Sequence, residues 1–150
     1  AVRRIATSLR PSVLDQLGLA AALEWQGQEF RARTGIDVKM IISNDGAGIP
    51  DDISSSAFRI LQESLTNVAR HAKATMVTIR LDQTPTMLTL EVTDNGVGAP
   101  PRCLDGTKSL GVVGMRERAL ACGGEFTVSG YPNHGTTVSL RVPLYPEAAR

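Results

Sequence analysis

The chain contains few of the residues that most often build metal centres and nucleophilic sites. Its 150 residues include only two cysteines and two histidines, and aromatic residues account for 4%. Cys103 and Cys122 lack metal-ligand spacing, which excludes a structural zinc site. Cys122 stands in an apolar helical run, so we expect a small buried thiol there rather than the nucleophile of a Cys–His pair.

Neither sign of charge dominates, and long hydrophobic runs are absent. Lys and Arg number 16 against 15 for Asp and Glu, a net charge of +1, which argues against nucleic acid or a membrane surface as partners. The longest apolar runs are far shorter than the ~20 residues of a spanning helix, and no basic and apolar leader opens the sequence. We therefore expect a cytoplasmic domain, and the sequence leaves open whether a longer protein is anchored in the inner membrane.

What the chain does contain suits one globular domain. A chain of this length can bury roughly two thirds of its unfolded surface, and a hydrophobic fraction of 42% can fill the core. Residues 1–9 are compatible with a helix that Pro11 would end. Hydrophobic spacing predicts further helices over 17–33, 58–72 and 115–122, and strands over 36–42, 76–82, 87–94, 125–129 and 136–142.

The predicted strands alternate apolar and polar residues. Such alternation is typical of a sheet with one face in water, whereas parallel strands buried on both faces are continuously apolar. We therefore expect an α+β fold, a two-layer sandwich in which helices cover one face of a mixed, mainly antiparallel sheet.

Two polar side chains are predicted to face the core. Side chains two apart on a strand share a face, so Leu90 and Val92 put Asp94 on the inward side. By the same parity Thr136, two residues before Val138, is expected to face inward on the last strand. An acid and a hydroxyl would thus meet over one apolar pocket, where polar groups need partners.

A polar stripe follows one face of the predicted helix over 58–72. Glu63 and Asn67 lie four residues apart, with Arg70 and His71 one turn further along. From spacing alone, a solvated helix face with a contact from Arg70 to Glu63 or Asn67 is the favoured interpretation.

Two glycine clusters bracket one loop. The first, DNGVG at 94–98, follows a strand directly, and the second, LGVVG at 110–114, lies at a helix start, where free N–H groups favour phosphate. Each alone is typical of a turn. The sequence has no Gly-x4-Gly-Lys-Ser/Thr, no third glycine opening a helix after Gly98, and no His-Arg-Asp or Asp-Phe-Gly, so the P-loop, Rossmann and protein-kinase motifs are excluded.

Taken together, these motifs resemble the catalytic ATP-binding domain of bacterial two-component sensor histidine kinases, in the GHKL superfamily with gyrase and MutL. The motifs stand in the family's order: FRILQESLTNVARHA (58–72) resembles the N box, DNGVG (94–98) the first Gly box, GVVGMRER (111–118) the second, and GT (135–136) the last short motif. The form GMRER, with LRP at 9–11 and LGL at 17–19, is similar to the nitrate-sensor-like subfamily.

The resemblance implies an ATP site with Mg²⁺. Asp94 would bond the adenine amino group, with Thr136 and Gly98 around a bridging water, and Gly96 belongs to the same ATP-binding loop. Asn67 would coordinate Mg²⁺ through its amide oxygen.

The remaining residues are implied at the phosphate end. Glu63 would orient or deprotonate the attacking group. Gly111 and Gly114 would let the loop close as a lid and present amides to the β and γ phosphates. Arg70 and His71 would lie near the phosphates, with Arg70 the more plausible electrostatic contact.

The family's phosphoacceptor is missing from this sequence. The family phosphorylates a histidine in a His-Asp or His-Glu context, which neither His71 nor His134 has. The resemblance therefore implies transfer of the γ-phosphoryl group to a histidine on a separate dimerisation domain, for relay to a response regulator. Residues 1–12 would end a dimerisation helix and its linker, and 13–150 would form the catalytic domain. We expect a homodimer of the full-length protein, and a monomeric fragment is an open alternative.

Two other functions stay open at this point. One is a non-catalytic nucleotide-binding regulatory module, against which the intact Glu63 and Asn67 argue. The other is an anti-sigma-factor kinase of the same superfamily, acting on a partner serine, but such chains do not carry the lead-in at 9–11.

Overall fold

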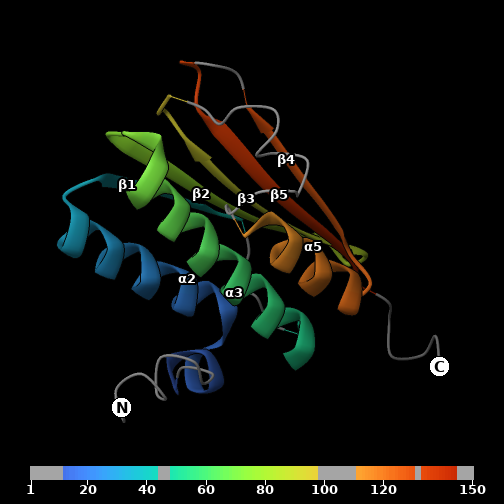
Figure 1. Cartoon of the computed structure of the whole chain (residues 1–150). Coiled ribbons are helices and arrows are strands. Elements are labelled where there is room, and N and C mark those ends of the chain that lie inside the picture. Colours follow the sequence, from blue (N-terminus) through green and yellow to red (C-terminus); the bar gives the residue numbers. More distant parts are fainter. Residues whose placement is uncertain (1–11, 44–47, 98–110, 131–132, 145–150) are drawn as a thin grey trace, which may run out of the picture.

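Helices and strands make up most of residues 12–43, 48–97, 111–130 and 133–144, which the computed structural model describes (Figure 1). The helices are α2 (Ser12–Thr34), α3 (Asp51–Asn67), its π-helical continuation η1 (Val68–Ala72) and α5 (Val112–Ala121). The strands are β1 (Asp37–Ile42), β2 (Met76–Gln83), β3 (Met87–Asp94), β4 (Glu125–Gly130) and β5 (Thr136–Pro143).

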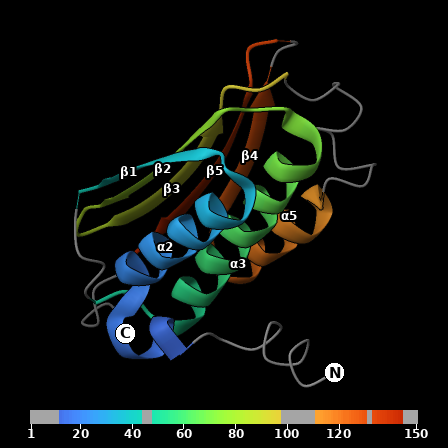
Figure 2. The same ribbon diagram turned by 90° about the vertical axis from the view of Figure 1, so that its left-hand side faces the viewer.

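The strands pair in the order β1-β2-β3-β5-β4. β1 runs parallel to β2, and every other pair of neighbours is antiparallel. The helices lie side by side on one face of the sheet, as two views at right angles show (Figures 1 and 2). The predicted two-layer α+β fold with a mixed, mainly antiparallel sheet is therefore confirmed.

The core lies between the helices and the inner face of the sheet. Phe58, Leu61 and Leu65, spaced three and four apart on α3, are at most 1% exposed. Ile79 of β2 and Leu90 of β3 are equally buried on the inner face of the sheet. Burying each such side chain contributes about 1.5–3 kcal/mol, so this layer interface fixes where α3 lies over the strands.

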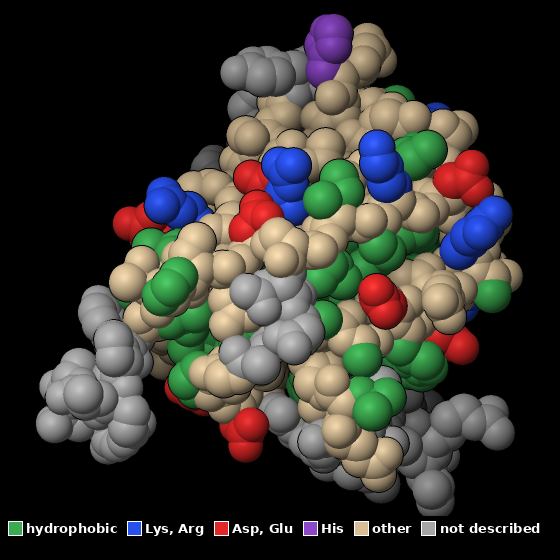
Figure 3. All heavy atoms as spheres, turned by 180° about the vertical axis from the view of Figure 1, so that it is seen from behind, with side chains coloured by type: hydrophobic (Ala, Val, Ile, Leu, Met, Phe, Trp, Pro, Cys, Tyr) green, Lys and Arg blue, Asp and Glu red, His purple; other side chains and the backbone are tan. Residues whose placement is uncertain are grey.

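The outer face of the sheet is polar. Arg80 of β2 lies opposite Glu91 of β3, and Glu125 of β4 lies opposite Arg141 of β5, so each cross-strand pair joins opposite charges. Seen from behind, the molecule shows charges of both signs dispersed among other side chains (Figure 3). A polar group that faces inward is therefore a stronger functional candidate than one on this face.

Helix α2 begins earlier than predicted and contains a break. It starts at Ser12 rather than near 17, and Gly18 interrupts it with φ 89° and ψ 179°. The hydrophobic pattern does not reveal the break because Leu14 and Leu19, on either side of it, are both buried. The end is as predicted, at Thr34, and Gly35 follows with φ 78°.

The other two helices also differ from prediction at their ends. The helix predicted over 58–72 starts at Asp51, directly after Pro50, and its last five residues form the π-helical turn η1. Helix α5 starts at Val112, three residues before the predicted start, because Gly111 adopts a left-handed conformation that ends the preceding loop without a side-chain cap.

Some predictions concern residues outside the described ranges. They include the helical character of 1–9 and the loop over 98–110, which contains Gly98 and Cys103. The division of the chain at 12/13 stays a prediction. Among the described helices, none combines the length and the apolar character that crossing a membrane requires. Cys122 is half-buried rather than fully buried, and burial raises the pKa of its thiol, in keeping with an unreactive group.

Candidate functional site

Asp94, the last residue of β3, is a carboxylate buried against the core. Its side chain is 6% exposed, on the same face as Val92, as the strand parity predicts. Its Oδ1 atom accepts a hydrogen bond of 2.8 Å from the backbone N–H of Gly96. Burial raises the pKa of Asp94, while hydrogen bonds from the N–H groups of Gly96 and Thr136 act in the opposite direction. A carboxylate has about four acceptor positions, so it retains capacity for a ligand's donor.

Thr136 and Gly135 lie beside Asp94 on the neighbouring strand β5 and the turn before it. Thr137 lies opposite Thr93 in the β3–β5 pairing, which brings Thr136 beside Asp94. A Cβ atom on Gly135, whose φ is 82°, would overlap with the backbone carbonyl oxygen of Asp94. Glycine is therefore required at 135 by both conformation and space.

Asn95 anchors the loop that follows Asp94. Its Oδ1 atom accepts hydrogen bonds from the N–H groups of Thr75 at 2.9 Å and Met76 at 3.1 Å, and its Nδ2 donates to the Thr75 hydroxyl at 2.9 Å. These bonds tie the loop to the start of β2 and so hold Gly96 where it bonds Asp94. The sequence does not single out this positioning residue.

Glu63 and Gly111 bring the N-box-like motif and the second glycine cluster together. Glu63 is partly buried on α3, and Gly111 precedes α5 with φ 74°. A Cβ atom built on Gly111 would lie 2.5 Å from Oε2 of Glu63 and 2.9 Å from its Cδ. The carboxylate therefore sits against the start of α5, where free N–H groups and the helix dipole favour negative charge.

The rest of the predicted polar stripe lies at the end of α3. Asn67 is the last residue of α3 and is partly buried. Arg70 is exposed on η1, and the described residues contain no ion pair between Arg70 and Glu63. The side chain of His71 lies outside the description. Single π-helical turns occur often at functional sites, and this one begins directly after Asn67.

The available oxygen donors suit Mg²⁺ held together with a phosphate ligand. Among the described residues, no three His, Cys, Asp or Glu side chains cluster as a metal site. Mg²⁺ is commonly bound by one or two protein oxygens while phosphates and waters complete its shell. Asn67 and Glu63, one helical turn apart, can supply such oxygens, so these residues fit the ion.

A groove of about 940 Å³ runs across the outer side of the helix layer. Its lining comes from α2, α3 and the start and middle of α5: Trp25, Gln26, Glu29, Arg33, Arg59, Gln62, Glu63, Leu65, Thr66, Gly111, Gly114, Met115 and Arg118. Glu63, Gly111 and Gly114 belong to it, whereas Asp94, Thr136 and Asn67 do not. The sequence does not single out the arginines of this groove: Arg59 and Arg118 fall inside motifs whose glycines and acids carry the interpretation, and Arg33 falls in no motif.

Comparison with known proteins identifies the family. Residues 52–146 match the family described as histidine kinase-, DNA gyrase B-, and HSP90-like ATPase. The chain belongs to this ATPase family. Membership implies that the domain binds ATP, and the predicted resemblance to the catalytic domain of sensor histidine kinases is confirmed at the level of the family.

Individual relatives carry histidine-kinase names. The chain is 35% identical over 150 residues to the signal transduction histidine-protein kinase/phosphatase DegS of Brevibacillus brevis, covering 97% of this chain and 38% of that protein. It is 36% identical to the sensor histidine kinase LiaS of Bacillus subtilis (97% and 40%) and 33% identical to the oxygen sensor histidine kinase NreB of Staphylococcus carnosus (95% and 41%). The chain thus spans about two fifths of the length of these curated relatives.

Solved structures share the fold. The histidine kinase domain of the blue-light activated histidine kinase EL346 of Erythrobacter litoralis superposes with a TM-score of 0.75 at 23% identity, covering 89% of this chain and 69% of that one. The mycobacterial sensor histidine kinase MprB gives a TM-score of 0.62 at 22% identity, covering 83% and 95%. At these identities the likeness concerns the fold.

Proposed function

We propose that this domain binds ATP with Mg²⁺ and donates the γ-phosphoryl group to a histidine of a dimerisation domain, for relay to a response regulator. The observation that carries the proposal is the buried Asp94 carboxylate, whose hydrogen-bond donors among the described residues are backbone N–H groups. These N–H groups leave acceptor positions of the carboxylate open, and a ligand donor that fills one of them offsets part of the cost of burying the charge.

The adenine amino group supplies such a donor. Asp94 accepts its hydrogen bond, while Gly96 and Thr136 keep the carboxylate in place through their N–H groups. Gly98, in the loop that follows, belongs to the same proposed pocket. A guanine base would present a carbonyl oxygen at this position, and two acceptors would then face each other, so the pocket selects adenine.

The phosphates lie, in this proposal, between the end of α3 and the start of α5. Bound Mg²⁺ would neutralise charge that develops on the phosphates. Asn67 holds the ion through its amide oxygen, and Arg70 and His71 complete the electrostatic surroundings. Gly111 and Gly114 bring backbone N–H groups close to the phosphates without a side chain in between.

Glu63 acts on the attacking group. Its carboxylate lies against the start of α5, one helical turn from Asn67. From there it orients the acceptor's imidazole or accepts its proton while the imidazole nitrogen attacks the phosphorus atom and ADP departs.

The acceptor comes from another polypeptide or another part of a longer one. His134 is exposed just before Gly135, on the loop between β4 and β5, and no acidic residue follows either histidine directly. The proposed partners are therefore a dimerisation domain that forms a homodimer in the full-length protein and a response regulator, in the cytoplasm.

Calorimetric titration tests the adenine assignment. We expect the chain to bind ADP and a non-hydrolysable ATP analogue, with Mg²⁺ strengthening the second, and Asp94→Asn to lose this binding, because an amide cannot replace the carboxylate against both N–H donors and the amino group. The matched control is Asp82→Asn, whose side chain is 47% exposed. Equal affinity of Asp94→Asn and the wild-type chain would refute the assignment.

A further inference from the structure

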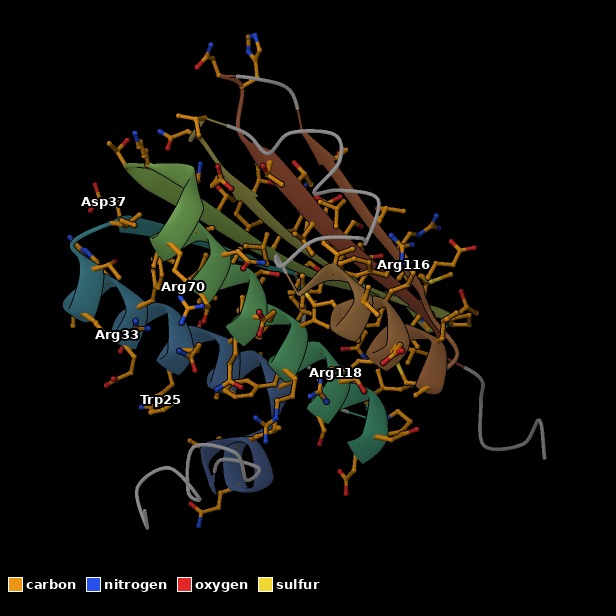
Figure 4. The ribbon with its side chains drawn as sticks, in the orientation of Figure 1. Trp25, Arg33, Asp37, Arg70, Arg116 and Arg118 are labelled. Carbon is orange, nitrogen blue, oxygen red and sulfur yellow. The ribbon has the colours of Figure 1, made fainter. Side chains whose placement is uncertain are left out.

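The groove on the helix layer continues past the proposed phosphate end. Gly111 and Glu63 mark that end, and the groove extends from there between α2 and α5 with α3 as its floor. Figure 4 shows Trp25 and Arg33 on the α2 side of α3 and Arg118 on the α5 side. Asn67 and Arg59 stand on opposite sides of Glu63 along α3, so this part of the groove leads away from the proposed Mg²⁺ site.

Arg59 of α3 and Arg118 of α5 both line this groove. Burial lowers the pKa of Arg59, and the nearby guanidinium of Arg118 lowers it further. Arg118 is exposed on α5, and within the described part of the chain no hydrogen bond or ion pair involves it. A carboxylate bound between the two guanidinium groups would accept charge-assisted hydrogen bonds from both.

The other groups in the groove narrow the class of ligand. Glu29 and Glu63 line it as well, so a polyphosphate without a bound cation, or a nucleic acid, lying along the groove would meet two negative charges. Trp25 is 43% exposed and offers an apolar surface. The chain's own first ten residues carry three arginines and no acid, so they do not complement the arginine pair.

We propose that this groove is a docking site for an acidic segment of a partner protein, with one of its carboxylates between Arg59 and Arg118 and an apolar side chain against Trp25. The mixed charges of the groove match a peptide with spaced carboxylates rather than a uniform polyanion. Docking of this kind requires no nucleotide, so it stands independently of the proposed phosphoryl transfer.

The chain carries its own reporter of docking. Trp25 is the sole tryptophan, so the intrinsic tryptophan fluorescence reports on the groove. The probe is an amphipathic peptide of about 14 residues, or about four helical turns, with Leu at helical spacing, a few spaced Glu residues and Gln elsewhere; the matched probe has Lys in place of Glu. We expect a saturable change in emission with the Glu peptide and none with the Lys peptide.

Two variants on one helix provide the test. Arg118→Ala should weaken binding of the Glu peptide about tenfold or more, because it removes charge-assisted hydrogen bonds to the peptide carboxylate. Arg116→Ala removes the same charge, but Arg116 donates to the Phe126 carbonyl oxygen at 3.2 Å, on the side of α5 facing β4 (Figure 4). This variant should bind the Glu peptide like the wild-type chain. Circular dichroism checks that both variants are folded.

Several outcomes would overturn the docking site. One is the absence of a saturable change up to about 1 mM peptide, a concentration equal to the Kd of a weak complex. The others are equal binding of the Lys peptide and equal losses in both arginine variants. Tighter binding of tripolyphosphate with the same dependence on Arg118 would also overturn it, because the arginine pair would then serve a phosphate chain.

Discussion

At the scale of single residues, the burial of Asp94 makes the free energy of unfolding depend on pH. Because its folded pKa lies above the unfolded value, the folded state binds more protons between the two, and stability falls as pH rises through the folded pKa. Asp94→Asn removes this titration. We expect the stability of the wild-type chain, relative to the variant, to be lower at pH 7 than at about pH 3.5, below the unfolded pKa of about 3.9.

Urea unfolding at the two pH values measures this difference. Asp82→Asn is the control, because this substitution makes the same change of side chain on the outer face, at a carboxylate that is 47% exposed. A pH-independent difference between Asp94→Asn and the wild-type chain would contradict the proposed cost of ionising Asp94. A positive result also shows that loss of nucleotide binding in this variant is not caused by unfolding at neutral pH.

At the scale of elements, the contact between α3 and α5 depends on a residue without a side chain. Gly111→Ala would strain a left-handed residue and push the Glu63 carboxylate away from the start of α5. Gly123→Ala is the matched control, because Gly123 has φ 83° and no atom within 4 Å of the added Cβ. Each substitution should lower the free energy of unfolding by about 1–2 kcal/mol, the cost of the left-handed conformation.

Function should separate the two glycine variants. Only Gly111→Ala displaces Glu63, so only this variant should lose phosphoryl transfer in the full-length kinase, while urea unfolding reports similar stabilities. Equal transfer rates for both variants would mean that the position of Glu63 against α5 has no part in the reaction. The Glu63 side chain can move aside, which is why we expect a functional rather than a folding defect from the added methyl group.

Strands were more predictable from sequence than helix ends. Alternation with a period of two places Val92 and Asp94 on one face whatever the neighbouring strand, so the burial of Asp94 followed from local pattern alone. The break at Gly18 and the π-helical turn after Asn67 depend instead on how helices pack over the sheet. The start of α5 was missed because Gly111 supplies a conformation rather than a capping side chain.

At the scale of the whole molecule, one site formed between distant segments was predictable from the sequence and another was not. The Asp94 site was predictable because motifs and strand parity agreed on its members. The groove was not, since Trp25, Arg59 and Arg118 belong to three helices whose relative positions no local pattern fixes. Glu63 of α3 and Gly111 at the start of α5 were each marked by a motif, and the structure places them close together.

The last prediction concerns the division of labour between this domain and its acceptor. Incubated with labelled ATP and Mg²⁺, the chain alone should bind nucleotide but incorporate no phosphoryl group, because neither of its two histidines has an acid beside it. Adding a dimerisation domain of the same kinase should produce acid-labile label on that domain, as expected of phosphohistidine. Glu63→Gln should lower this transfer about 10²-fold or more, the usual contribution of a general base, with Glu91→Gln on the outer face as the control. Label on this chain itself, or unchanged transfer by Glu63→Gln, would contradict the assigned roles.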